Sequence, residues 1–143
     1  MKLVFIFLIL FSATCVAQED VKCDPKVLKL VTEKLDSLNE KQVTLFLNNF
    51  DASCQNNVEF SEASNELLFK VLQKKTDLFL EAFIVTSEDS RSQILLELKK
   101  PISDKISIDD ALKAVNASKV ANESKIQILR VLRVAKSMMI EKM

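Results

Sequence analysis

The 143-residue chain contains no glycine at all, although average usage would give about ten glycines at this length. Without glycine, the chain lacks both the P-loop and the dinucleotide-binding fingerprint. The tight turns of β-hairpins also lose the residue that they favour. The composition therefore disfavours nucleotide-binding folds and meandering sheets.

Histidine, tryptophan and tyrosine are absent as well. The absence of histidine removes the usual Ser–His and Cys–His nucleophile pairs and the zinc sites that include histidine. Carboxylate, lysine or Ser–Lys chemistry remains, and no motif indicates any of them. We therefore expect no catalytic residue, no metal ion and no cofactor, and we expect that the chain is not an enzyme.

The first residues have the pattern of a cleavable signal peptide. Met1-Lys2 give a short positive start, and nine apolar residues run from Leu3 to Phe11. Small residues then lead to Ala17, which Gln18 follows, so we expect cleavage between these two residues. The apolar run is too short for a membrane span, which needs about 20 residues. We therefore expect membrane contact only through this leader.

These features predict a leader over residues 1–17 and a single exported domain over 18–143, with a secreted or periplasmic location. Cys15 leaves a second interpretation of the leader open. A bacterial lipoprotein leader ends in a short apolar and small-residue box before a lipid-bearing cysteine. Here that box is Ser12-Ala13-Thr14-Cys15, in which Ser12 and Thr14 depart from the pattern. Lipidation is therefore the less favoured alternative.

Removal of residues 1–17 from the 143-residue chain leaves 126 residues, which suits one domain with a core. Lys2 is the only charge in the leader, so the exported part has 19 basic and 20 acidic residues. Nucleic-acid binding requires a basic surface. We therefore expect no nucleic-acid partner.

The cut after Ala17 leaves two cysteines, Cys23 and Cys54. In an oxidising compartment an even pair predicts a disulfide bond. Closing a loop of this size would stabilise the fold by roughly 3–4 kcal/mol in the chain-entropy model. Two free buried thiols are the alternative. The long spacing disfavours a redox-active pair of the CxxC type.

Apolar residues recur at helical spacing along the exported part, and no segment alternates cleanly as a strand does. Residues that commonly precede helices divide this pattern into segments. The expected starts are Asp24-Pro25, Asn39 (with Gln42 three residues on), Ser61, Thr76, Ser87, Ser107 and Asn122.

The first helix is expected over about 25–38, and the second helix has an apolar face that continues from Val43 to Cys54. An antiparallel hairpin of these two helices would bring Cys23 and Cys54 together. The stretch before the third helix is expected to be a loop that includes Val58 and Phe60. At Lys74-Lys75 the chain either continues as one helix or bends, and the last helix is expected to end near Glu141.

The predicted fold class is therefore all-α, with six to seven short helices. Two packings fit this pattern: a compact bundle, and a short HEAT-like stack of helix pairs. We favour a bundle or a short right-angled stack.

Six phenylalanines admit two interpretations. They could line a pocket for an apolar ligand, as pockets are mostly apolar, or they could form an ordinary core, because aromatic residues bury a large area each. We favour the core. The six are Phe46, Phe50, Phe60, Phe69, Phe79 and Phe83.

The last helix carries Lys125, Arg130, Arg133 and Lys136 beside a wide apolar face. Such a helix can lie on an anionic membrane. Because the chain as a whole is neutral, we favour a buried C-terminal helix with solvated charges at its edge.

Paired acids and two glycosylation sequons complete the candidate sites. A general acid/base pair needs two carboxylates that converge on one point. Adjacent acids at the start of a helix instead interact favourably with the helix dipole. We favour this second interpretation of the acid pairs. The sequons matter only in a eukaryotic secretory pathway. The acid pairs are Glu19-Asp20, Glu88-Asp89 and Asp109-Asp110, and the sequons begin at Asn116 and Asn122.

The sequence does not identify a function. The best hypothesis is a protein-interaction module that binds another exported or envelope protein. The alternative is a carrier of an apolar small molecule or lipid in a pocket lined by phenylalanine.

Overall fold

The computed structural model describes residues 22–143. The predicted leader, Cys15 and the expected cleavage between Ala17 and Gln18 lie outside the described residues. Within residues 22–143 the chain forms seven α-helices and two short 3-10 helices and has no strand, which confirms the all-α class. The helices are α1 (Pro25–Glu33), η1 (Leu35–Ser37), α2 (Glu40–Asn48), η2 (Ala52–Asn56), α3 (Val58–Lys74), α4 (Thr76–Val85), α5 (Glu88–Lys99), α6 (Ile108–Ala117) and α7 (Glu123–Glu141).

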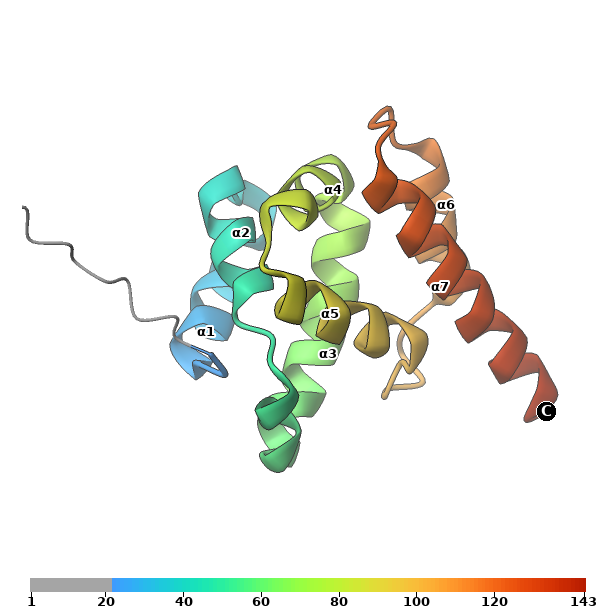
Figure 1. The fold of residues 1–143 in the computed structure, drawn as a ribbon. Helices are drawn as coiled ribbons and strands as arrows, with labels where there is room; N and C mark the ends of the chain where they lie inside the picture. The colour runs from blue at the N-terminus through green and yellow to red at the C-terminus, as the bar shows by residue number, and fades with distance from the viewer. Residues whose placement is uncertain (1–21) are drawn as a thin grey trace, which may run out of the picture.

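The helices are arranged as three pairs that follow one another in chain order. The pairs are α1–α2, α3–α4 and α6–α7 (Figure 1). In one layer α3 contacts both α1 and α6, and in the other layer α4 contacts both α2 and α7. These contacts have the pattern of a helix-pair stack, which is one of the two packings that fit the sequence.

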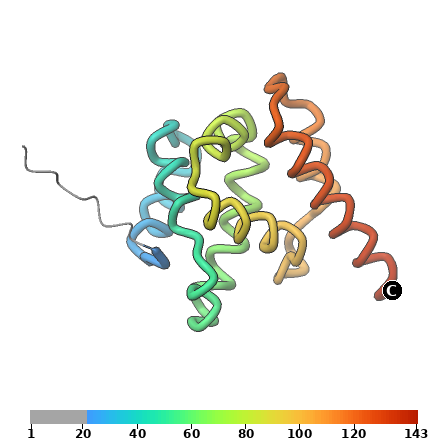
Figure 2. The backbone as a smooth tube through the Cα atoms, in the orientation of Figure 1, coloured from blue at the N-terminus to red at the C-terminus, as the bar shows by residue number. Residues whose placement is uncertain are grey.

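Helix α5 joins the stack into a compact body. It crosses in front of α3 and contacts α2, α3 and α7 (Figure 2). Helix α5 therefore holds the first pair and the last pair to the centre.

The core is a single cluster of apolar side chains that every α-helix supplies. Aliphatic and aromatic residues at helical spacing face inward, as the sequence predicts. Burying a large apolar side chain stabilises the fold by about 1.5–3 kcal/mol. The largest fully buried side chains are Phe46, Phe69, Phe79, Phe83, Leu47, Leu68, Leu72, Leu80, Ile94, Leu98, Ile128 and Leu132.

Several helices begin where the sequence predicts, because a side chain accepts a hydrogen bond from a free backbone N–H group. At α2 the Asn39 side chain accepts from the Gln42 amide over 2.9 Å, and the Gln42 side chain accepts from the Asn39 amide over 3.1 Å. Ser87, Ser107 and Asn122 cap α5, α6 and α7 in the same way.

The first two helices are shorter than predicted. Helix α1 ends at Glu33 and a 3-10 turn follows, and α2 ends at Asn48. At the end of α2, the side chain of the buried Asn49 bonds to the backbone of Asp24, and its carbonyl accepts from the Cys23 amide instead of continuing the helix. The prediction that Cys54 lies on the second helix is wrong, because Cys54 belongs to η2.

Helix α3 starts before the predicted position. The expected cap was Ser61, but the side chain of Asn57 accepts from the Phe60 amide over 3.1 Å, and the helix begins at Val58. Val58 and Phe60 therefore lie on a helix and not on a loop. Phe60 is buried, whereas Val58 is exposed.

The chain bends at Lys75 and does not run as one helix. Thr76 was expected to cap the next helix, but it is the first residue of α4. Its hydroxyl donates to the carbonyl of Leu72 over 2.7 Å, so it bonds back to α3. Helix α4 has no side-chain cap.

Helices in this glycine-free chain end without left-handed residues. Among residues 22–143 only Cys23 has a positive φ, of 56°. A left-handed glycine commonly follows a helix, but here residues with negative φ take that position, as Lys75 and Lys100 do at −129°.

Candidate interaction surface

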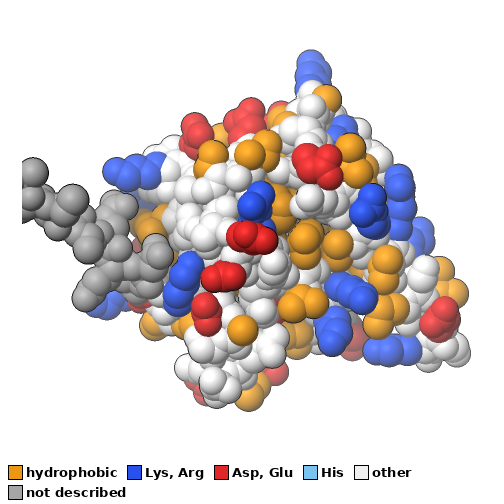
Figure 3. All heavy atoms as spheres, viewed as in Figure 1, with side chains coloured by type: hydrophobic (Ala, Val, Ile, Leu, Met, Phe, Trp, Pro, Cys, Tyr) orange, Lys and Arg blue, Asp and Glu red, His pale blue; other side chains and the backbone are white. Residues whose placement is uncertain are grey.

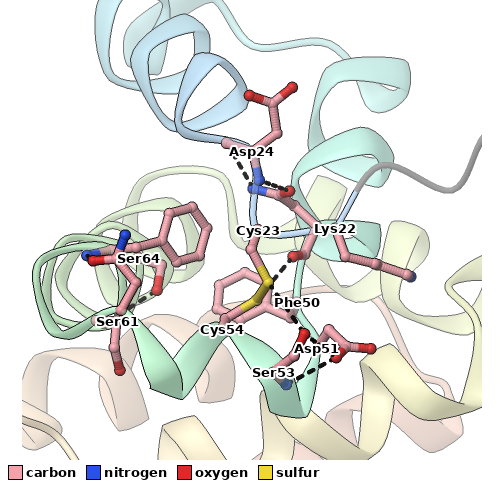
Figure 4. The surroundings of a disulfide bond; sticks show 12 residues. Lys22, Cys23, Asp24, Phe50, Asp51, Ser53, Cys54, Ser61 and Ser64 are labelled. Carbon is pink, nitrogen blue, oxygen red and sulfur yellow. Dashed lines mark hydrogen bonds between the residues drawn. A yellow bond between two sulfur atoms is a disulfide. The ribbon is translucent and has the colours of Figure 1, made fainter.

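The start of the described chain is held to the end of α2. The Sγ atoms of Cys23 and Cys54 lie 2.11 Å apart and their Cα atoms 5.3 Å apart (Figure 4). The predicted cysteine pair is thus at disulfide distance, with the hairpin of α1 and α2 bringing it together. The amide of Cys23 also donates to the carbonyl of Asn49 over 2.9 Å.

Asn49 reinforces this connection. Its side-chain oxygen accepts from the Asp24 amide over 2.8 Å, and its side-chain nitrogen donates to the Asp24 carbonyl over 3.1 Å. Asn49 is buried, so both bonds form away from solvent. These bonds and the cysteine pair together fix where the chain enters α1.

Two polar groups beside the cysteine pair complete this region. Lys22 donates to the carbonyl of Asn48 over 2.7 Å and to the hydroxyl of Ser90 over 2.9 Å. Asp51 accepts from the hydroxyl and the amide of Ser53 (Figure 4). The hydroxyl of Ser53, and then its amide, hold the pKa of the Asp51 carboxyl below its ordinary value. Every one of these polar contacts supports the fold.

The six phenylalanines belong to the core. All six are buried, and Phe46 and Phe50 meet edge to face with ring centroids 5.2 Å apart. Phe79 and Phe83 stack with centroids 6.4 Å apart. The core interpretation of these residues is confirmed. Four surface hollows of the described part have none of these phenylalanines in their walls.

A polar cluster in the interior joins α3 to α5. The side-chain nitrogen of Asn65 donates to the Glu97 carboxylate over 2.7 Å, and Gln93 donates to the other carboxylate oxygen over 3.1 Å. The Asn65 oxygen accepts from the Ile102 amide over 3.1 Å. Sequence reasoning missed this cluster, although the spacing of Gln93 and Glu97 on one helix face was available.

The predicted acid pairs lie at helix starts where the structure describes them. Glu88-Asp89 and Asp109-Asp110 fall in the first turns of α5 and α6. Glu19-Asp20 lies outside the described residues. Of the two sequon asparagines, Asn116 is exposed at the end of α6, and the side chain of Asn122 caps α7.

The predicted basic residues of α7 divide into two sets. Lys125 donates to the Ser118 carbonyl over 2.6 Å, and Lys136 lies 2.7 Å from the Asp109 carboxylate. Both therefore bind other parts of the fold. Arg130 and Arg133 are exposed, and neither has a carboxylate of residues 22–143 within 4.0 Å.

The outer face of α7 exposes apolar side chains beside these arginines. Ile126 is 55 % exposed, Val134 39 % and Ile140 58 %. Ile126, Arg130 and Arg133 are spaced four and three residues apart, which places them on one helix face. Figure 3 shows basic and hydrophobic side chains interleaved over α7. The favoured prediction of a buried helix with charges at its edge is therefore incomplete, because this face is both cationic and apolar.

Two adjoining hollows lie along this face. The first has a volume of about 380 Å³ and is lined by Ile126, Arg130, Arg133, Val134 and Ser137. The second, of about 390 Å³, lies between α5 and α7 and is lined by Glu88, Arg91, Ser92, Leu95, Gln127, Arg130 and Val131. Because Arg130 lines both, the hollows form one continuous surface, which we call the α5–α7 surface.

Within residues 22–143 no three His, Cys, Asp or Glu side chains are placed to hold a metal ion. None of the helices in this described part has the length and apolar character needed to cross a membrane. No family model, curated protein or solved structure matches the chain.

Proposed function

We propose that this chain is an exported protein-interaction module, whose partner is another exported or envelope protein. The observation that carries the proposal is the α5–α7 surface, where Ile126 and Val134 remain exposed beside arginines on a well-packed domain. Interfaces combine apolar residues with arginine, which is enriched there while lysine is depleted.

Export rests on the leader pattern of residues 1–17 and is supported by the cysteine pair. Disulfides form and persist in oxidising compartments, and Cys23 and Cys54 lie at disulfide distance. A secreted or periplasmic location therefore fits both features.

The carrier of an apolar ligand stays a prediction without a supporting observation. The carrier hypothesis predicts a pocket lined by phenylalanine, whereas the six rings pack within the core. The expectation that the chain is not an enzyme is likewise a prediction.

Native mass spectrometry of the protein purified from its own source tests the proposal. We expect a defined complex with a second protein, and a chain that begins at Gln18. The double variant Ile126→Asp/Val134→Asp should lose this partner, while the matched exposed control Val58→Asp should keep it. A chain that is monomeric at every concentration, or one that retains its leader, would contradict the proposal.

A further inference from the structure

The chain gathers all of its arginines at one place. It has 20 basic residues, of which only Arg91, Arg130 and Arg133 are arginine. Arg91 and Arg130 line one hollow of the α5–α7 surface, and Arg130 and Arg133 line the other. The lysines, in contrast, occur on several helices, including Lys26 on α1, Lys70 on α3 and Lys125 on α7. The positions of arginine therefore differ from those of basic residues in general.

These guanidinium groups are available to a partner. None of the three lies within 4.0 Å of a carboxylate of residues 22–143, although Glu88 lines the same hollow as Arg91. Lysines elsewhere do pair within the fold, as Lys74 does with Asp36 at 3.2 Å. A guanidinium presents a planar fork of donors that matches a carboxylate at two points. The surface thus offers unsatisfied sites of the kind that bind carboxylates.

Apolar side chains lie beside the arginines. Ile126 and Val134 flank them on α7, and Leu95 of α5 lies in the second hollow. A helix that lies on a lipid surface separates its apolar sector from its basic sector. Here Ile126, Arg130 and Arg133 share one face, so the pattern favours a protein partner whose contact face combines apolar residues with carboxylates.

The dimensions of the surface fit a short helix. From Ile126 to Ser137 the α7 face extends about 16 Å at 1.5 Å per residue. Arg130 and Arg133 are one turn apart, so their Cβ atoms lie about 5–6 Å apart. Carboxylates spaced by one turn on a facing helix would meet them. This corresponds to recognition of an amphipathic helix by a groove.

We infer that the α5–α7 surface docks an acidic amphipathic helix of the partner protein. Carboxylates of that helix bind Arg91, Arg130 and Arg133, and its apolar side chains cover Ile126 and Val134. This inference rests on the proposed function and specifies the chemistry of the partner.

A synthetic 16-residue peptide serves as the probe. Leucine occupies one helical face, and glutamate occupies the positions that flank it. One control peptide replaces glutamate by lysine, and a second scrambles the sequence. Binding to the exported chain, labelled with ¹⁵N, is followed by chemical-shift changes. We expect the glutamate peptide alone to bind, with its shifts confined to α5 and α7.

Matched variants separate arginine recognition from general charge. The triple variant Arg91→Gln/Arg130→Gln/Arg133→Gln should weaken binding by about tenfold or more. The control Lys26→Gln/Lys41→Gln/Lys70→Gln removes the same number of charges from exposed sites on α1, α2 and α3, and should change binding by less than about twofold. Circular dichroism serves as the check that both variants remain folded.

Several outcomes would overturn the inference. Equal losses of peptide affinity in the two triple variants would show that binding depends on net charge and not on the arginines. Equal binding of the lysine or scrambled peptide, or no shifts on α5 and α7, would remove the acidic helix as the ligand. Arginine-dependent binding to vesicles of anionic phospholipid, without peptide binding, would assign the surface to a membrane. In each case a native complex that depends on Ile126 and Val134 would leave the proposed function standing.

Discussion

Asn65 on α3 donates a hydrogen bond to the carboxylate of Glu97 on α5 over 2.7 Å, and both side chains are buried. Asn65 also donates to the backbone carbonyl of Glu97 over 3.2 Å and accepts from the amide of Ile102. One amide group thus binds α5 and the segment that follows it to the central helix. Because α5 forms one wall of the α5–α7 surface, this contact positions the proposed binding site.

We expect Asn65→Ala to lower the free energy of unfolding by about 2 kcal/mol, because it leaves buried polar groups without their partner. Urea unfolding measures the loss. The matched control is Asn116→Ala, which removes an exposed side chain on α6 and should cost less than about 0.5 kcal/mol. An Asn65→Ala midpoint equal to that of the parent chain would show that this contact contributes nothing.

Removing the cysteine pair should destabilise the fold without changing its helices. The pair joins residues 31 positions apart. We expect Cys23→Ala/Cys54→Ala to lose roughly 3–4 kcal/mol in the chain-entropy model. Thermal unfolding followed by circular dichroism measures the loss, with Ser53→Ala as the neighbouring control. An unchanged melting temperature, or free thiols in the mass of the purified protein, would contradict the disulfide.

Asn57 and Ser61 are the two candidates for the residue that caps α3. The structure assigns the cap to Asn57, whereas the sequence pattern favours Ser61. Asn57→Ala should cost about 1 kcal/mol, because an orphan amide of the first turn loses its acceptor. Ser61→Ala should have little effect on the urea midpoint. The reverse order of the two losses would show that the helix starts where the sequence pattern indicated.

The carboxyl of Asp51 should titrate below the ordinary range of aspartate. The hydroxyl and amide of Ser53 stabilise its charged form and lower its pKa. Because the folded-state pKa is the lower one, the stabilisation is present above the unfolded-state pKa of about 3.9 and is lost as the pH falls through the folded-state value. We expect Ser53→Ala to raise the pKa in an NMR titration, while Ser37→Ala leaves it unchanged. A pKa that does not respond to Ser53→Ala would assign the shift to another cause.

The predictable parts of this fold are those that depend on neighbouring residues. Asn39 and Gln42 form a capping box that can be recognised from their spacing alone, and Ser107 and Asn122 cap their helices as predicted. The all-α class follows in the same way from the periodicity of apolar residues. Capping residues and the helical spacing of apolar residues can both be recognised from the sequence itself.

The error at the end of α2 arose because distant residues decide the local structure there. Helix α2 ends at Asn48, although its apolar spacing continues to Cys54, because Asn49 bonds to Asp24 and Cys23 just before α1. Cys54 therefore reaches Cys23 from a 3-10 turn. The periodic pattern of apolar residues does not predict the contact between Asn49 and Asp24.

The candidate surface was predictable only in part. The basic residues of α7 could be identified from the sequence, but the pairing of Lys136 with Asp109 depends on how α6 and α7 pack. Arg91 is far from Arg130 in the chain, and only the contact of α5 with α7 places them in one hollow. Tertiary packing thus distinguishes the arginines from the lysines beside them.

Site-specific photo-crosslinking in the source cells shows whether the α5–α7 surface binds an acidic helix of a partner protein. A photoreactive residue is placed at Val134 on the α5–α7 surface or, as a control, at the exposed Val58 on α3. We predict a discrete cross-linked product from position 134, formed with an acidic helical segment of an exported protein. We also predict that this product is lost in the triple arginine variant. Equal products from the two positions, or no product from position 134, would contradict this prediction.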